Sequence, residues 1–323
     1  MPFPSALPVL VSGSLAYDRI MRFPGLFKDH IFPNKLDAIS VSFAADQLEE
    51  SLGGVGGNIA YALNMVGQSP FLVSTLGKDA ASYLAAFERL GIETAGIAVH
   101  PTLLSATASI ISDDAGGQIT GFFTGPLAHG RPIGPLPSDL KIALISPSTT
   151  KVMQAHLKEC SALGLTTVFD PGQRMTELTA AEMREMILQA KVVIGNEYEM
   201  SLLSGKTGWS AQDILNKAPL MITTLGRAGC KIERKGEKPL IIPAILIRES
   251  IDPTGAGDAF RGGFFAAYAH GAPLTACAQL GCAVASFCLE HQGCQTYSFT
   301  FDELNLRYQA AYGQPINLTP SHD

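Results

Sequence analysis

The sequence has no apolar run that approaches the roughly 18 residues of a membrane-spanning helix. It is also poor in charge: only 16% of its residues are charged, and 29 acidic side chains against 23 basic ones leave a net charge of −6. A nucleic-acid partner requires concentrated positive charge to meet the phosphate backbone, and no such cluster occurs. We therefore expect a globular protein that binds neither a membrane nor a nucleic acid.

Cysteine is scarce and follows no metal-binding pattern. The six cysteines form no C-x-x-C pair, and the last four, from Cys277 to Cys294, lie in an apolar stretch with a helical pattern. Such residues are typical of buried free thiols in a reducing compartment, and a zinc site or a disulfide set is the less favoured alternative. No basic segment precedes the apolar residues 9–11, so no secretion signal is expected and the predicted location is cytoplasmic.

Short apolar runs alternate with helical patterns along most of the 323 residues. The runs, which are typical of strands buried on both faces of a parallel sheet, lie at 9–11, 71–73, 142–145, 166–169, 192–194 and 220–223. The helical patterns lie at about 58–66, 79–90, 150–163, 180–189, 197–204 and 211–217. Each is long enough for the crossover that joins neighbouring parallel strands. This order predicts an α/β fold: a doubly wound, mostly parallel sheet with helices on both faces.

Two regions, at about 15–48 and 102–125, interrupt this alternation. Apolar and polar residues alternate with period 2 at Ala38–Phe43 and again at Thr107–Ile111, and the second stretch is followed by a turn signal at Asp113–Gly117. We interpret these regions as strands of a small β lid inserted into the α/β core. The whole 323-residue chain is then expected to form a single domain.

The strongest chemical signal is the segment Asp252-Pro-Thr-Gly-Ala-Gly-Asp258, which leads directly into a helical pattern. Its small residues let a ligand approach the backbone closely, and the first amides of the helix would point toward that ligand, as in anion sites. Asp258 would lie beside a transferring phosphoryl group, where it could accept the proton of an attacking hydroxyl. The alternative is an ordinary glycine turn followed by an aspartate that favours the positive helix end.

A second glycine-rich segment, Gly53-Gly-Val-Gly-Gly-Asn58, also opens a helical pattern. A surface without side chains suits a sugar or nucleoside that lies against the backbone, and the Asn58 amide offers a donor and an acceptor to hydroxyls. A glycine turn with an asparagine cap is the alternative. The spacing Gly-x-Gly-x-x-Gly is not matched, which argues against a dinucleotide-binding enzyme. Near the N-terminus, Asp18 could hold a vicinal diol with its two carboxylate oxygens.

Two further segments follow apolar runs. Asn196-Glu-Tyr-Glu199 is either a helix-capping pair or a site at which Glu199, through a water molecule, approaches a magnesium ion that bridges ATP phosphates. The spacing alone leaves both open. Thr224-Leu-Gly-Arg-Ala-Gly229 is either a βα turn of the kind that binds nucleotides at the carboxyl end of a parallel strand or a plain hairpin turn.

Together these segments occur in the order and spacing of the ribokinase (PfkB) carbohydrate kinase superfamily, and the resemblance covers essentially the whole chain. The segment that ends at Asp258 is highly specific for that superfamily, whereas the others are informative as a set. Within the superfamily the chain is most similar to the bacterial adenosine kinases. That finer resemblance rests on residues 12–18 with 21–25, 40–43, 53–58, 206–210 and 252–261.

The resemblance implies a ribokinase-like fold and a phosphotransferase that acts on an alcohol group. Adenosine would be phosphorylated at its 5′-hydroxyl to give AMP and ADP, as in purine salvage. The expected cofactors are ATP and Mg²⁺, and many related enzymes respond to K⁺. The resemblance assigns Asp258 as the base and Gly255, Ala256 and Gly257 as the anion hole. The substrate site would comprise Ser14, Asp18, Ser42, Phe43, Gly54, Gly57, Asn58, Phe122 and Gln173. ATP would contact Asn196, Thr224, Gly226 and Gly229, with Glu199 near the metal through water.

The chain departs from the adenosine kinase pattern at two positions. Ile110 stands where an aromatic residue is expected on the lid strand, and Arg174 follows Gln173 in place of a second amide. The main alternative is therefore a kinase of a free sugar such as ribose or fructose, or of another nucleoside. A non-catalytic nucleoside-binding protein on the same fold is a minor alternative. Exposed lid strands can pair between subunits, so a homodimer through the lid is a further expectation.

Overall fold

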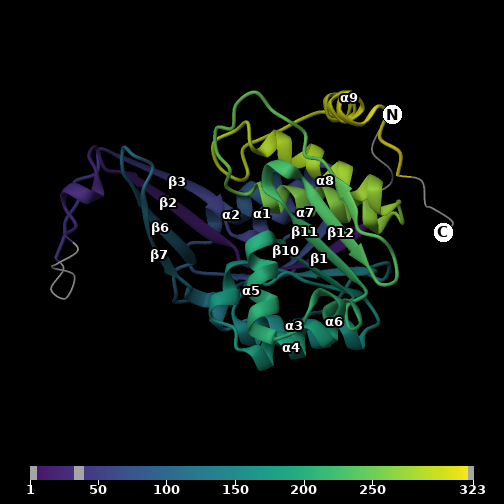
Figure 1. Ribbon diagram of the computed structural model, residues 1–323. Helices are drawn as coiled ribbons and strands as arrows, with labels where there is room; N and C mark the ends of the chain where they lie inside the picture. The colour runs from purple at the N-terminus through teal and green to yellow at the C-terminus, as the bar shows by residue number, and fades with distance from the viewer. Residues whose placement is uncertain (1–5, 33–39, 319–323) are drawn as a thin grey trace.

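The computed structural model describes residues 6–32 and 40–318 and contains two sheets (Figure 1). The larger sheet has nine strands in the order β13-β12-β11-β10-β9-β8-β1-β4-β5. Their bounds are β1 (Pro8–Ser12), β4 (Ser69–Leu76), β5 (Ile97–Val99), β8 (Ile142–Ile145), β9 (Thr166–Phe169), β10 (Val192–Asn196), β11 (Leu220–Thr224), β12 (Cys230–Arg234) and β13 (Leu240–Ile242). All neighbours pair in parallel except β11 with β12 and β12 with β13. The predicted mostly parallel sheet is confirmed.

Helices cover both faces of this sheet (Figure 1). One face carries α1 (Val55–Met65), α2 (Ala81–Arg89), α7 (Ala256–Ala269), α8 (Leu274–Cys288) and α9 (Phe301–Tyr312). The other carries α3 (Thr150–Ala162), α4 (Ala180–Gln189), α5 (Glu197–Thr207) and α6 (Ala211–Leu215). Strand side chains alternate between the two cores, so Val9 and Val11 pack on the first face and Leu10 on the second. The predicted core strands and helices are all present, with ends shifted by a few residues. Within the described ranges, no helix combines the length and the apolar character that crossing a membrane requires.

The smaller sheet is the predicted lid and projects from one side of the molecule (Figure 1). Its strands, in the order β3-β2-β6-β7, are β3 (Gln47–Gly53), β2 (Ala16–Arg22), β6 (Ala106–Ser112) and β7 (Gln118–Phe123). Strands β2 and β6 are parallel, and the two outer pairs are antiparallel. The predicted turn at Asp113–Gly117 joins β6 to β7, and Asp113 Oδ1 accepts hydrogen bonds from the amides of Ala115 and Gly117 at 3.0 and 2.7 Å.

One lid strand was predicted at the wrong place. Residues 38 and 39 of the expected strand lie outside the described residues, and Ser40 to Phe43 form no strand. The ring of Phe43 packs instead against those of Phe23 and Phe27, at centroid distances of 4.9 and 5.0 Å. The strand that pairs antiparallel with β2 is β3, a polar segment whose first four residues are exposed. Aromatic packing thus holds Phe43 in an irregular connection.

The strand order reverses beside β1. The chain leaves β1 for β4 on one side and returns later through β8 on the other. In open α/β sheets, ligands bind in the crevice outside the carboxyl ends of the strands at such a reversal. The Ser14 amide donates a hydrogen bond to the Pro147 carbonyl at 3.0 Å and so joins the segments that follow β1 and β8. The fold therefore directs attention to this edge of the sheet.

Candidate active site

At the N-terminus of α7, backbone amides lie close together with few hydrogen-bond acceptors. Gly255 precedes the helix in the left-handed region, with φ 78°, a conformation that glycine adopts without strain. The Ala256 amide makes one long hydrogen bond, 3.3 Å, to the Pro253 carbonyl, whereas the amides of Gly257 and Asp258 have no acceptor among the described residues. Free amides at a helix N-terminus, with the positive end of the helix dipole, form a place for an anion. The geometry fits the predicted anion hole.

Asp258 lies in the first turn of α7, partly exposed. The Asn58 side-chain amide donates a hydrogen bond to its Oδ2 at 2.9 Å. Burial raises the pKa of Asp258 to about 7, against the opposing effects of the Arg261 charge and the Asn58 hydrogen bond. A carboxylate with a pKa near neutrality is suited to accept and release a proton at that pH.

Asn58 is held in turn by residues that the sequence did not identify. Gln295 Nε2 donates hydrogen bonds to Asn58 Oδ1 at 3.0 Å and to the Tyr83 hydroxyl at 3.1 Å. The Tyr83 hydroxyl donates to the Gly53 carbonyl at 2.7 Å. A side chain at position 57 would not fit, because its Cβ would lie 2.1 Å from the Tyr83 hydroxyl oxygen. A single glutamine or tyrosine in a sequence does not indicate a functional site. Only the fold brings Gln295 and Tyr83 to Asn58.

Ser14 and Gly54 shape the backbone beside Asn58. Gly54 has φ 88°, and a Cβ there would lie 2.6 Å from the Ser14 carbonyl oxygen, so only glycine fits. Ser14 Oγ accepts a hydrogen bond from the Val55 amide at 3.1 Å, at the start of α1. The loop after β1 and the glycine segment therefore lie in direct contact, as a shared substrate site requires.

Asp18 faces the same side of the lid as Phe122. In the sheet register Asp18 lies opposite Ala108 of β6, and Ala108 lies opposite Phe122 of β7, so the three side chains share one face. The Phe122 side chain is 48% exposed. Burial, followed by the nearby charge of Asp252, raises the pKa of Asp18 to about 6, and its carboxylate accepts no hydrogen bond from the described residues. Free carboxylate oxygens beside an open aromatic ring suit a ligand that carries both hydroxyls and a flat apolar group.

Arg261 and Asp170 form a buried ion pair near Asp258, and the sequence analysis assigned neither a role. Arg261 Nε and Nη2 donate to the two Asp170 oxygens at 2.6 and 2.7 Å, and Nη1 donates to the Gly257 carbonyl at 2.9 Å. Asp170 follows the end of β9. The available signal was an arginine within the largely apolar helix α7, because a buried arginine requires a partner.

Asn196 and Glu199 form the capping pair that was one of two alternatives. Glu199 Oε2 accepts from the Asn196 amide at 2.7 Å, and Asn196 Oδ1 accepts from the Glu199 amide at 2.8 Å. Burial, followed by the charge of Asp170, raises the pKa of Glu199. Mg²⁺ usually keeps several of its waters and binds through one or two carboxylates and the substrate phosphates. Glu199 can therefore cap the helix and still contact a metal through a water molecule.

The segment from Thr224 to Gly229 is a hairpin turn and no βα turn. Strand β12 follows β11 directly and pairs antiparallel to it, and the Leu225 amide donates to the Gly229 carbonyl at 2.7 Å. The interpretation as a βα turn was therefore wrong. The turn nevertheless lies at the carboxyl end of the parallel strand β11, next to the end of β10 where Asn196 lies.

The structure does not bring all the predicted residues together. Phe43 packs beyond the end of β2, beside Phe23. Phe23 lies five residues along the chain from Asp18, which corresponds to about 16 Å at the usual rise of a strand. Phe43, which packs beside Phe23, is therefore distant from Asp18. The neighbouring Ser42 is exposed. Gln173 is exposed in a short 3₁₀ segment after β9.

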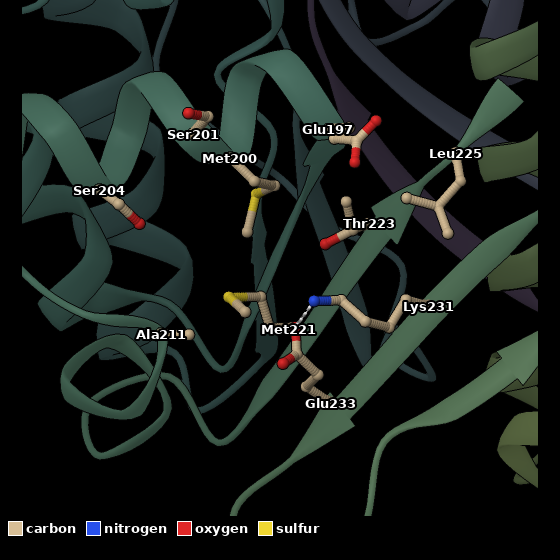
Figure 2. A pocket seen from close by; sticks show the side chains of 10 residues that line it. All are labelled: Glu197, Met200, Ser201, Ser204, Ala211, Met221, Thr223, Leu225, Lys231 and Glu233. Atoms are coloured by element: carbon tan, nitrogen blue, oxygen red, sulfur yellow. Dashed lines mark ion pairs between the residues drawn. The ribbon is translucent and has the colours of Figure 1, made fainter.

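A separate hollow lies on the face of the large sheet that α5 covers, opposite the α7 face. Figure 2 shows it between α5 and the β11–β12 hairpin, with Met200, Met221 and Thr223 among its walls and an ion pair of 2.9 Å between Lys231 and Glu233. Its volume is about 230 Å³. Strand alternation directs Thr223 into this hollow and Thr224 to the α7 face. None of the predicted site residues lines it.

A carboxylate beside free amides at a helix N-terminus is the arrangement that phosphoryl transfer to an alcohol group requires. The model of the pfkB family of carbohydrate kinases matches residues 14–300. The chain belongs to this family, and the predicted ribokinase-like fold and class of enzyme are confirmed.

Relatives of this chain within the family include several nucleoside kinases. The nucleoside kinase of Burkholderia thailandensis in complex with inosine is 35% identical, with a TM-score of 0.85 over 95% of this chain and 99% of that one. The nucleoside kinase of Methanocaldococcus jannaschii is 29% identical over 85% of this chain and 92% of its own length. The similarity to adenosine kinase 1 of Arabidopsis thaliana, 27% identical, covers only 32% of this chain. These relatives support the superfamily and give no special support to the adenosine kinases within it.

Proposed function

We propose that the protein is a nucleoside kinase that transfers the γ-phosphoryl group of ATP to a 5′-hydroxyl, with adenosine as the expected substrate and AMP and ADP as products. The observation that carries the proposal is the position of Asp258, which lies within 2.9 Å of Asn58 and directly follows the unpaired amide of Gly257. A hydroxyl bound at Asn58 would lie beside both the base and the phosphate.

A nucleoside is favoured over a free sugar by the lid. The row that joins Asp18 to Phe122 offers a carboxylate for the ribose hydroxyls and an aromatic ring for the base. Stacking on such a ring is worth roughly 1–3 kcal/mol per base at nucleic-acid sites, whereas a free sugar has no flat group to place there. The B. thailandensis relative was solved with inosine, so inosine is the second candidate. Ser42, Phe43 and Gln173 would contact the nucleoside only after the lid moves toward the core.

The proposed reaction uses the base and the amides together. Asp258 accepts the 5′-hydroxyl proton as the oxygen attacks the γ-phosphorus, and the bond to the β-phosphate oxygen breaks to release ADP. The amides of Gly257 and Asp258 stabilise the negative charge on the equatorial oxygens. Closure of the lid excludes water, which would otherwise accept the phosphoryl group.

ATP and Mg²⁺ are the proposed cofactors. The free amides at the start of α7 fit phosphate oxygens, and the ends of β10 and β11 bring Asn196, Thr224, Gly226 and Gly229 to the same edge of the sheet. The half-buried carboxylate of Glu199 would hold Mg²⁺ through water, and the metal would neutralise phosphate charge. A response to K⁺ and a cytoplasmic location stay predictions.

The test is ADP production from ATP with a panel of adenosine, inosine, guanosine, cytidine, ribose and fructose, at fixed Mg²⁺ and with or without K⁺. We expect the highest kcat/KM for adenosine. Equal or higher values for ribose or fructose would establish the sugar-kinase alternative. If no compound stimulates ADP release, the non-catalytic alternative is correct.

We also propose a homodimer that pairs through the lid. On the face opposite Asp18, the register aligns Leu48, Met21, Ile111 and Ile119 in one apolar row, and the Leu48 side chain is 66% exposed. If the rows of two protomers pack against each other, both are removed from water. Light scattering should give twice the chain mass, and Leu48→Lys should return a monomer.

A further inference from the structure

A directed chain of hydrogen bonds leads from the backbone to the base. It runs from the Gly53 carbonyl through the side chains of Tyr83, Gln295 and Asn58 to Asp258, with donor–acceptor distances of 2.7, 3.1, 3.0 and 2.9 Å. Its members come from the glycine segment, α2, the loop after α8, α1 and α7. Only Asn58 and Asp258 belong to the proposed substrate and base positions.

Each bond in this chain fixes the direction of the next. The Tyr83 proton is used on the Gly53 carbonyl, so the hydroxyl oxygen can only accept from Gln295. Gln295 therefore presents its NH₂ group, and the same group donates to Asn58 Oδ1. With its oxygen engaged, the Asn58 amide must turn its own NH₂ group toward Asp258.

The orientation of the Gln295 amide leaves one of its own polar atoms unpaired. Its Oε1 is buried and has no hydrogen-bond partner among the described residues. A buried unpaired carbonyl is destabilising, and a flipped amide would place this oxygen against Asn58 Oδ1, where two acceptors meet. The observed arrangement therefore favours the Asn58 orientation at the expense of the Gln295 carbonyl.

We propose that Gln295 is a positioning residue for phosphoryl transfer: it holds the Asn58 amide so that its NH₂ group, and never its oxygen, faces the Asp258 carboxylate. The inference rests on the proposed role of Asp258 as the base. A donor stabilises the ionised carboxylate, whereas an amide oxygen in the same place repels it. Loss of Gln295 frees Asn58 to rotate, so that the base is protonated up to a higher pH.

The variant Gln295→Met keeps the length of the side chain and removes both donors. We expect the acidic limb of the kcat/KM–pH profile to move up by roughly one pH unit, as expected for the loss of a hydrogen bond to a charged group. With the limb moved from about pH 7 to about pH 8, activity at pH 7 should fall by roughly five- to sixfold and recover toward the wild-type value above pH 9. Recovery at high pH separates an effect on the base from a general loss of active protein.

Tyr61→Phe is the matched control. Tyr61 also lies on α1, and its hydroxyl donates to the Tyr297 carbonyl, two residues after Gln295. This variant loosens the same loop from the same helix without touching the amide chain, so its acidic limb should stay in place. If Gln295→Met does not fold, Tyr83→Phe removes the anchor at the other end and should move the limb in the same direction by a smaller amount.

The outcomes distinguish the two proposals. A fully active Asp258→Asn variant, or a wild-type profile without an acidic limb, would overturn the role of Asp258 as the base. An inactive Asp258→Asn variant together with a limb that neither Gln295→Met nor Tyr83→Phe moves would overturn the positioning role of Gln295 alone. An equal shift in Tyr61→Phe would overturn it as well, because loop attachment would then be the cause.

Discussion

Arg261 holds both carboxylate oxygens of Asp170, at 2.6 and 2.7 Å, across 91 residues of sequence. The two side chains are only 7% and 1% exposed. Because Arg261 also donates to the Gly257 carbonyl, the pair fixes the first turn of α7 to the end of β9. A buried ion pair thus supports the backbone of the proposed anion site from within the protein.

Asp170→Ala should lower the free energy of unfolding by about 3–5 kcal/mol, since it leaves the buried Arg261 charge without its ion-pair partner. Urea denaturation followed by circular dichroism measures the loss. The control is Glu50→Ala, which breaks the exposed Arg19–Glu50 pair of 2.7 Å and should cost about 1 kcal/mol or less. Similar values for the two variants would show that the buried pair has no special weight.

Asp258→Asn should reduce kcat by about 10²- to 10⁴-fold, the usual contribution of a general base. Nucleoside affinity should change little, because an amide at 258 still reaches Asn58. Steady-state kinetics and calorimetric titration with adenosine measure the two quantities separately. A variant that keeps more than a tenth of the wild-type turnover would remove Asp258 from the base position.

The stability of the protein should depend on the ionisation of Asp258. Its pKa is raised from 3.8 to about 7 in the folded state, so the folded protein binds this proton more tightly than the unfolded chain does. The resulting stabilisation is complete below pH 4 and is lost as the pH rises through 7. Relative to the wild type, Asp258→Asn should therefore gain stability between pH 4 and 7 and level off above. Urea denaturation at four pH values tests this, and a difference that does not vary with pH would contradict the raised pKa.

Asp18→Ala should raise KM for nucleosides with a smaller effect on kcat, because the carboxylate would hold the substrate diol and takes no part in proton transfer. The matched control is Asp114→Ala, which removes another lid carboxylate, one that pairs with Arg22 at 3.3 Å on the surface. Steady-state kinetics with adenosine compare the two. Unchanged affinity in Asp18→Ala would show that the ribose is held elsewhere.

The core of the fold was predictable because parallel strands buried on both faces must be apolar along their whole length. The run at 142–145 coincides with β8 and the run at 166–169 with β9. Strands at or next to the edges of the sheets lack this signal. β3, with the sequence Gln-Leu-Glu-Glu-Ser-Leu-Gly, is exposed over most of its length, and β12 alternates with charged residues, so neither stands out from a loop.

Candidate site residues could be predicted only where glycines share a short segment with a polar side chain. Asp258 and Asn58 belong to such segments, and the structure places them in contact. Gln295 and Asp170 were missed because each acts through a residue distant in sequence, and composition says nothing about such pairs. The hairpin at Thr224 was ambiguous since the same glycines serve either kind of turn.

The hydrogen-bond chain from Gly53 to Asp258 also sets an order of events during synthesis. Four of its five members are translated by residue 258, yet the link that orients Asn58 waits for position 295. All nine strands of the larger sheet precede position 295, so they are synthesised before the residue that would orient Asn58. A chain that stops before the loop after α8 would lack that residue, and nothing would then hold the Asn58 amide toward Asp258.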